Sequence, residues 1–418
     1  METHEDRLYF AAEDSDEGKR ELYYLDLSKA QALASGNKNL SIVSIQNGVS
    51  DELKYAEKVF LNDNPDVQVS YKVLDLTYPD AKVKILSGDL DMDIAVINTS
   101  LIYDLAASGA LVDLSHFDDI NSIMTGEDIL DGLYEYSSVD GFLFGVPFSY
   151  WADVLKVNTY LREKLNLNLP DANWTWQDFY DYAKQARKDL DGNGSKDSYI
   201  MGARKNSPLF LEAYLCKFVN QVTGKVDFNN DIFINLLNLW KKMCDEDLIK
   251  TISDPPYIKD DTVLFTLDTA GYHMGNDEYV CIPALSNNLK VYPCQGSFLC
   301  ISSLSKNPNL AAKFIVTYLS KKVQATHTYK IGELFVKSLP MNYLYKDLSI
   351  YDIDIDSLNE KNKEIIINVA KYVTPKSYPF NLKTYITQEV MPQFMSGKIT
   401  APEAAALIQK KAEMMIKE

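Results

Sequence analysis

Hydrophobic and polar residues follow two different patterns along the chain, and the pattern changes near Leu40. Before that point, two β-prone runs at 8–11 and 21–25 flank an acidic turn that ends at Gly18, which predicts a hairpin. The small polar stretch 28–39 predicts a linker or a frayed helix. After Leu40, short apolar runs alternate with amphipathic stretches, and this order predicts a largely parallel sheet with helices on its faces.

The alternating region begins with three strand–helix pairs. We expect strands at 41–46, 67–73 and 93–97 and helices at 51–63, 79–87 and 101–108. Ligands of such sheets lie beyond the carboxyl ends of the strands. The polar side chains at these ends can donate to and accept from hydroxyl groups, although plain turn chemistry explains the same residue types. They are Gln46, Asn47, Asn98, Thr99 and Ser100.

Capping signals predict several later helices. Residues 175–178 and 400–403 have the spacing of a capping box. Asn307 followed by Pro308 predicts an N-cap with proline at the first helical position. The last helix, over 401–417, has balanced charges, so its apolar face is explained by packing on the core and not by membrane binding. That face consists of Ala404, Leu407, Ile408, Ala412 and Met415.

Composition narrows the class of protein. The 418 residues are 46% hydrophobic and 24% charged, which excludes collagen-like and disordered chains. The net charge of −17 argues against nucleic acid or an anionic membrane as the main partner, because both would repel the chain. No apolar run reaches the roughly 18–20 residues that span a bilayer.

Cysteine and histidine residues are few and irregularly spaced. The five cysteines fit neither a disulfide framework nor a zinc site, and the four histidines form no metal-binding pattern. Cys281 and Cys294 are close enough in sequence to pair in a secreted protein, but small buried side chains are the simpler interpretation. Residues 1–10 lack a basic start followed by an apolar stretch, so we expect either a cytoplasmic protein or a processed or truncated secreted one.

Six segments of the chain form a series in a fixed order. They are LNDNPDVQVSY (61–71), LSGDLDMDIAVINTSLIYDLAASGALVDLS (86–115), GFLFGVPFSYWADVLKVN (141–158), NWTWQDFYDYAKQARKDLDGNG (173–194), SKNPNLAAKFIVTYLS (305–320) and ITAPEAAALIQKKAEMMIKE (399–418). Together they resemble the extracellular solute-binding proteins of ABC importers, in particular the sugar-binding family that includes maltose-binding protein. The resemblance extends from about residue 40 to 418 and leaves 1–39 outside.

This resemblance implies an α/β, periplasmic-binding-protein-like fold with two lobes, each with a mainly parallel sheet, joined by crossing hinge segments. One lobe would contain 40–149 and 297–344, and the other 152–295 and 347–418. Residues 1–39 would be a hairpin and linker left from a larger surface protein.

The resemblance also implies a function. The chain would be a monomeric, non-enzymatic protein that captures an oligosaccharide between its lobes and delivers it to the membrane permease of an ABC transporter. It would act outside the cell, held to the membrane as a lipoprotein in its full-length form. Two alternatives remain: a ligand-sensing or surface glycan-binding module without transport, and a glycoside hydrolase, which would need paired carboxylates.

Candidate ligand residues follow from the same layout. Near the first crossing, Tyr150 and Trp151 can offer a flat apolar face to a sugar ring, and Asp153 can accept hydrogen bonds from hydroxyl groups. Packing between the lobes is the alternative explanation. Tyr272 and Tyr378 match segments in which the family presents stacking aromatics. Trp176 and Trp240, in contrast, are predicted to be packing residues.

One acidic loop predicts a calcium site. Oxygen-bearing side chains occupy positions 1, 3, 5, 7 and 9 of the pattern that begins an EF-hand loop, with a glycine at position 6. Position 12 is Ile200 and supplies no ligand, so another group or water would have to complete the site. An ordinary turn after a helix is the alternative. The candidate ligands are Asp189, Asp191, Asn193, Ser195 and Asp197.

Overall fold

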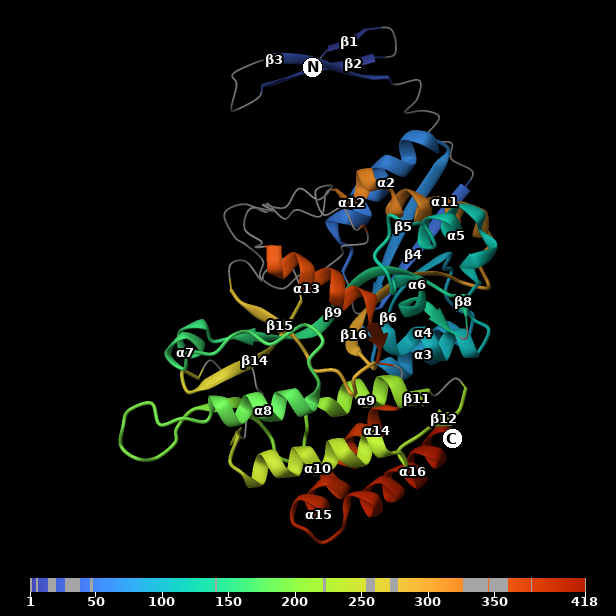
Figure 1. The fold of residues 1–418 in the computed structure, drawn as a ribbon. Helices are drawn as coiled ribbons and strands as arrows, with labels where there is room; N and C mark the ends of the chain where they lie inside the picture. Colours follow the sequence, from blue (N-terminus) through green and yellow to red (C-terminus); the bar gives the residue numbers. More distant parts are fainter. Residues whose placement is uncertain are drawn as a thin grey trace.

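Two long strands, β9 (Val146–Val157) and β16 (Tyr292–Ile301), lie antiparallel at the centre of the main sheet of this computed structural model (Figure 1). The strand order across the sheet is β13-β10-β14-β9-β16-β6-β4-β5. The structure describes residues 2–4, 7–13, 20–26, 38–45, 48–139, 141–220, 223–252, 260–270, 277–325, 345, 360–376 and 378–417.

On one side of the two long strands lie β4 (Lys38–Ile45), β5 (Val67–Leu74) and β6 (Ile94–Asn98). β4 is parallel to both of its neighbours, as expected, whereas β6 is antiparallel to β16. The helices around these strands lie in the upper part and at the right of the middle part of Figure 1. They are α2 (Asp51–Asp63), α3 (Tyr78–Leu86), α4 (Thr99–Ala107), α5 (Asp118–Met124), α6 (Leu133–Tyr136), α11 (Pro308–Leu319) and α12 (Lys321–Gln324).

The other side of the sheet is built from the middle and end of the chain. β10 is parallel to β13 and β14, while β14 and β15 are antiparallel to β9, and β17 is parallel to β16. These strands are β10 (Tyr199–Ala203), β13 (Ile249–Thr251), β14 (Val263–Thr269), β15 (Tyr279–Cys281) and β17 (Val373–Pro375). The accompanying helices are α7 (Thr159–Lys164), α8 (Trp176–Ala186), α9 (Phe210–Phe218), α10 (Asp231–Asp245), α13 (Glu360–Lys371), α14 (Phe380–Tyr385), a π-helix (Ile386–Val390), α15 (Met391–Met395) and α16 (Ala401–Lys417).

The predicted N-terminal hairpin is confirmed and extended by a third strand. β2 (Arg7–Glu13) pairs antiparallel with β3 (Arg20–Asp26), and β1 (Glu2–His4) pairs with β2. The sheet of these three strands is separate from the main sheet. The predicted linker at 28–39 is shorter than expected, because β4 already begins at Lys38; its residues 28–37 lie outside the described part of the chain.

Capping explains where several helices begin. Both capping boxes form, through Thr175 with Asp178 and through Thr400 with Glu403. Asn307 is the N-cap residue of α11, as predicted, but its side chain makes no capping hydrogen bond; its amide donates instead to the carbonyl oxygen of Asn39 (3.1 Å). Pro308 does occupy the start of this helix, where its missing N–H costs nothing.

The core encloses most of the aromatic side chains that the structure describes. Trp176 and Trp240 are fully buried, as predicted, and all five cysteines are buried free thiols. On α16, Leu407 is exposed and the small Ala405 is buried in its place, so the predicted apolar face is rotated slightly. None of the described helices is long and apolar enough to cross a membrane.

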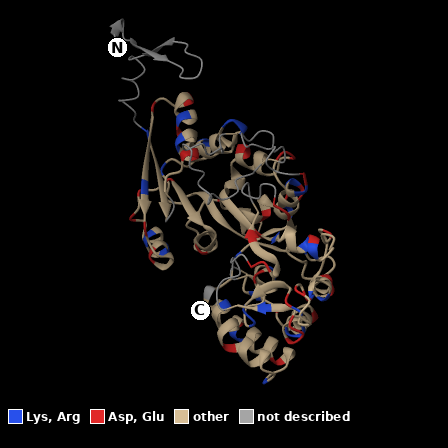
Figure 2. Ribbon diagram, turned by 90° about the vertical axis from the view of Figure 1, so that its left-hand side faces the viewer, with Lys and Arg blue, Asp and Glu red and all other residues tan. Residues whose placement is uncertain are grey.

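Charged residues are spread over the surfaces of both halves. Figure 2 shows acidic and basic positions interspersed along the helices and loops of each half. Many of the ion pairs join exposed side chains one helical turn apart, such as Lys184 with Asp181. Few of the charged side chains that the structure describes are buried, so the charge of this part of the chain is carried mainly by solvated faces.

Candidate functional site

One face of the crossing strands gathers polar side chains from both halves of the protein. Side chains alternate along a strand, so Ser149, Trp151 and Asp153 share one face of β9. Residues paired directly across a sheet project to the same side. Their partners are Ser297 for Ser149, Gln295 for Trp151 and Thr269 for Asp153, and Ser297 is also paired with Asn98. We call these seven residues the crossing face.

Trp151 and Gln295 are the accessible pair at the centre of the crossing face. Trp151 is half-buried and Gln295 is exposed. The hydroxyl-bearing pair beside them, Ser149 and Ser297, is buried. An aromatic ring beside a carboxamide therefore faces solvent at the point where the chain passes from one half to the other.

Tyr150 lies on the opposite face of β9, and the prediction that it is an exposed ligand residue is wrong. Its side chain is fully buried, and its ring lies 6.2 Å from that of Tyr136 between centroids. Tyr150 is paired across the sheet with Gly296, which has no side chain that would hold the two strands apart. The Tyr150 ring therefore packs between this face of the sheet and α6.

The loop after β6 is mainly structural. The amide oxygen of Asn98 accepts from Leu101 N–H (3.1 Å) and caps α4, so turn chemistry explains this residue. Thr99 is buried: its hydroxyl accepts from Gly296 N–H (2.8 Å) and donates to the Gly296 carbonyl oxygen (3.0 Å), which corrects its assignment as a ligand residue. Ser100 is exposed. The remaining candidates Gln46, Asn47 and Tyr272 lie outside the described residues.

A cluster of four charged side chains adjoins the crossing face at Asp153. Lys376 Nζ lies 2.5 Å from Glu212 Oε2 and 3.8 Å from Asp153 Oδ2, and Lys383 pairs with the other oxygen of Glu212. The side chains of Lys376, Asp153 and Glu212 are only 16%, 17% and 21% exposed. Two positive and two negative groups are thus held together with little access to water.

Burial and pairing shift the pKa values in this charged cluster in different directions. Burial raises the pKa of Asp153 to about 6, against the opposing effect of Lys376. Burial also opposes ionisation of Glu212, but Lys376 and Lys383 together hold the pKa of its carboxyl below the ordinary value. Burial raises the pKa of Tyr378, and the negative charges of Glu212 and Asp153 add to this effect. The structure therefore brings two predicted residues, Asp153 and Tyr378, to the same cluster.

Sequence reasoning missed Glu212, Lys376, Lys383 and Gln295. Glu212 and Lys376 are far apart in the chain, and no local motif connects them. Gln295 is identified only by the register that places it opposite Trp151. Long-range pairing, which a single sequence does not display, was the missing information.

The acidic loop after α8 brings three carboxylates together. Asp189, Asp191 and Asp197 each offer one oxygen, and these oxygens lie within 4.8 Å of one another. Asp189 also accepts from Gly192 N–H and Gly194 N–H (2.7 Å each), which folds the loop around it. Such a group of carboxylate oxygens fits a hard divalent cation such as Ca²⁺.

Beside these three carboxylates, the two other predicted metal ligands interact within the loop itself. The amide oxygen of Asn193 accepts from Ser195 N–H (2.8 Å), and its nitrogen donates to Asp191 (2.9 Å). Ser195 is exposed. These hydrogen bonds of Asn193 help to shape the turn that carries the three aspartates.

Comparison with known proteins agrees with this architecture. The sequence profile of the bacterial extracellular solute-binding proteins matches residues 56–336. A search of curated protein sequences found no significant match.

Solved structures of similar fold cover almost the whole chain. The sugar-binding protein MalE from Xanthomonas citri has a TM-score of 0.68 at 16% identity, covering 91% of this chain and 98% of its own. A cyclic alpha-maltosyl-1,6-maltose binding protein from Arthrobacter globiformis has a TM-score of 0.66 at 14% identity, covering 91% and 99%. An ABC substrate-binding protein from Listeria monocytogenes in complex with cycloalternan has a TM-score of 0.61 at 15% identity, also covering 91% and 99%. The predicted α/β, periplasmic-binding-protein-like fold is confirmed.

Proposed function

The chain belongs to the bacterial extracellular solute-binding proteins, which are not enzymes, and we propose that it captures a neutral oligosaccharide for delivery to an ABC transporter permease. The observation that carries this proposal is the accessible pair Trp151 and Gln295 on the crossing face. An indole ring offers an apolar surface to a sugar ring, and a carboxamide both donates to and accepts from hydroxyl groups.

The charges near the crossing face favour a neutral ligand. Lys376 and Lys383 are paired with Glu212, and Asp153 lies 3.8 Å from Lys376. An anionic ligand would have to compete for lysines that already have partners. Proteins of the same fold that were solved with cycloalternan and with acarbose support a carbohydrate as the ligand class.

Capture would proceed by closure of two lobes, formed by 40–149 with 297–344 and by 152–295 with 347–418. A ligand favours a closed arrangement only if it binds that arrangement more tightly than the open one. The crossing face supplies groups from both lobes, Ser149 from the first and Asp153 from the second. A sugar lying on this face would therefore contact both lobes and favour closure.

Replacing Trp151 with alanine is expected to weaken oligosaccharide binding by about tenfold or more, equivalent to about 1.4 kcal/mol, because the stacking surface is lost. Thermal-shift screening against linear and cyclic gluco-oligosaccharides, peptides and anions would identify a ligand, and isothermal titration would measure its affinity. Tyr160→Ala, at an aromatic residue 72% exposed on α7, is the matched control and should bind normally. A stabilising shift from peptides alone, or unchanged affinity of Trp151→Ala, would contradict the proposal.

The setting in which the protein acts is part of the same proposal. The family is extracellular, and we expect a monomer held at the outer surface by a lipid anchor on the full-length protein. The sheet of β1, β2 and β3 lies outside the matched residues 56–336, and it favours one alternative: a ligand-sensing or surface glycan-binding module without transport. The glycoside hydrolase alternative is set aside, because the family is non-enzymatic.

We also propose that the Asp189 loop binds Ca²⁺ as a structural ion. Chelation with EDTA should then lower the unfolding midpoint, and added calcium should restore it; an ion present at 100 times its Kd contributes about 2.7 kcal/mol. Asp189→Asn should abolish this response, whereas Asp63→Asn, at an exposed position on α2, should retain it. Identical midpoints with EDTA and with calcium would show that the loop is an ordinary turn.

A further inference from the structure

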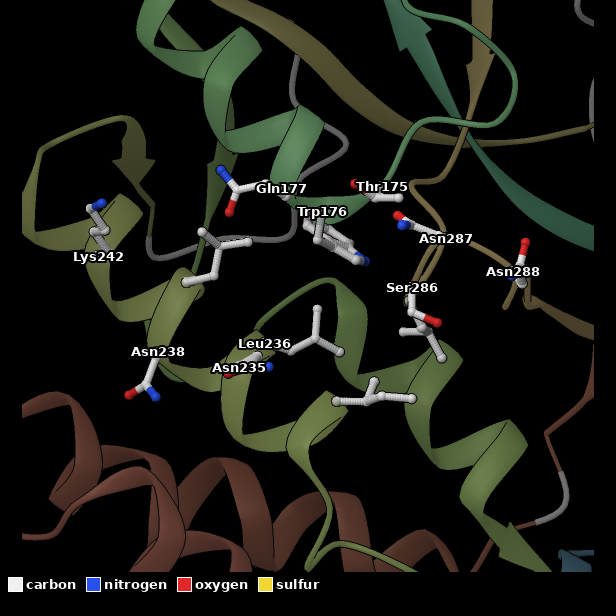
Figure 3. Close-up of a pocket in the computed structure, with 13 residues that line it drawn as sticks. Thr175, Trp176, Gln177, Asn235, Leu236, Asn238, Lys242, Ser286, Asn287 and Asn288 are labelled. Carbon is white, nitrogen blue, oxygen red and sulfur yellow. The ribbon is translucent and has the colours of Figure 1, made fainter.

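A pocket lies in the half of the protein that contains α8 and α10, and it shares no residue with the crossing face. It is bounded by the start of α8, one side of α10 and the turn at 285–288 (Figure 3). Its volume is about 620 Å³, which is in the range of small-molecule sites. We call it the amide pocket.

The amide pocket combines an apolar floor with a rim of carboxamides. The apolar side chains are Trp176, Ile232, Leu236, Leu239 and Leu285. The carboxamides come from three separate elements: Gln177 from α8, Asn235 and Asn238 from α10, and Asn287 and Asn288 from the turn. Figure 3 shows Asn235 and Asn287 on opposite sides of the pocket, with Trp176 between them.

The indole of Trp176 supplies a buried donor that has no acceptor. Its side chain is only 1% exposed, and its Nε1–H has no hydrogen-bond partner in the described part of the chain. The corresponding groups of Trp174 and Trp240 donate to the carbonyl oxygens of Cys281 (2.8 Å) and Lys205 (2.9 Å). Buried N–H groups are nearly always paired, because an unpaired one loses its water without compensation. In Figure 3 the Trp176 nitrogen is on the side of the ring that points toward Ser286.

The asparagine side chains at the rim also lack hydrogen-bond partners among the described residues. Asn235, Asn238, Asn287 and Asn288 are exposed, and their carboxamides make no hydrogen bond to any described residue. Each carboxamide can donate two hydrogen bonds and accept others. The one charged side chain of the lining is Lys242, whose ammonium group lies over the ring of Tyr180 at 4.6 Å. Apart from Lys242, the amide pocket is thus lined by neutral side chains, and its carboxamides offer both donors and acceptors.

We propose that the amide pocket is a second carbohydrate site, independent of the one on the crossing face. A neutral sugar matches its lining, because one face of a sugar ring is apolar enough to lie on leucine and indole surfaces while its edge carries hydroxyl groups. One ligand oxygen would accept from Trp176 Nε1–H, and hydroxyl groups would bond to Asn235 and Asn287 across the pocket. An anion would find a single cation there, Lys242, whose ammonium group already lies over the Tyr180 ring, and a metal ion would find no carboxylate in the lining.

Indole resonances provide a direct test on the full chain. The four tryptophans give four indole N–H signals in a proton–nitrogen correlation spectrum of isotope-labelled protein, which single Trp→Phe variants assign. Maltose, maltotriose and D-mannitol would be titrated separately. The Trp176 signal should move saturably with at least one of them. The double variant Asn235→Ala/Asn287→Ala should weaken this binding about tenfold or more. Asn229→Ala, at an exposed residue outside the pocket, should not.

The following results of the titration would contradict the proposed second site. A Trp176 signal that stays fixed at millimolar concentrations of all three sugars would do so, as would a shift that persists at full affinity in the double variant. A shift caused by alanine tripeptide and by none of the sugars would identify a peptide pocket instead. The Trp151 signal reports on the crossing face separately, so loss of the proposed function and loss of the second site are distinguishable.

Discussion

Glu212→Ala is expected to destabilise the protein by about 3 kcal/mol, because it leaves the largely buried Lys376 and the partly exposed Lys383 without their shared partner. Glu212 pairs with both Lys376 and Lys383, and its own side chain is 21% exposed. Urea unfolding followed by circular dichroism would measure the loss as a fall in the free energy of unfolding.

The matched control for this change is Glu163→Ala. Glu163 pairs with Arg162 at 3.5 Å but is 66% exposed, so its removal should cost no more than about 0.5 kcal/mol. Glu212→Gln should lose less stability than Glu212→Ala, because its carboxamide oxygen can still accept a hydrogen bond from one of the two lysines. A loss from Glu212→Ala no larger than that of the control would show that water screens the charged cluster.

Gly296→Ala is expected to cost about 3 kcal/mol or more, because the added carbon must force the two crossing strands apart. A Cβ at this position would lie 2.0 Å from the Ser149 carbonyl oxygen and 2.6 Å from the Tyr136 hydroxyl oxygen. The same movement would break both hydrogen bonds between Gly296 and Thr99. Thermal unfolding would measure the loss, and ligand titration would show whether the crossing face is still assembled.

Gly48→Ala is the control for the glycine change. A Cβ at Gly48 meets nothing within 4 Å, so this variant should be at least as stable as the wild type. Equal stability of the Gly296 and Gly48 variants would mean that the strands separate without cost at this point.

The sequence predicted best where the controlling interactions are local. The helix predicted at 51–63 is α2 (Asp51–Asp63). Two local signals agree on it: the spacing of its apolar residues, and the Ser50 hydroxyl oxygen, which accepts from Leu53 N–H (3.3 Å) and caps the helix. The Thr175 capping box is likewise a contact between residues three apart. Such signals involve only residues that are a few positions apart, so a short stretch of sequence is enough to predict the helix.

The candidate site was harder to predict because it depends on register. Tyr150 and Trp151 are adjacent, so alternation places only one of them on the crossing face. β9 is covered along most of both faces, and its sequence therefore lacks the apolar–polar alternation that would identify the exposed side. The amide pocket could not be predicted for a similar reason, since it also depends on long-range packing. Trp176 was correctly predicted to be buried, but only the packing of α8 against α10 and the 285–288 turn shows that its N–H lacks an acceptor.

The change of partner along β9 has a mechanical consequence. Up to Ala152 the strand pairs with β16, with a register shift between Ser297 and Phe298, and from Asp153 onward it pairs with β14 on its other edge and then also with β15. At the junction the carbonyl oxygen of Ala152 accepts from Ala270 N–H (2.8 Å). A rotation of one half against the other would therefore twist β9, which is hydrogen-bonded to neighbouring strands before and after this junction. Because strands carry a right-handed twist of their own, we expect this paired crossing to resist rotation more than an unpaired loop would.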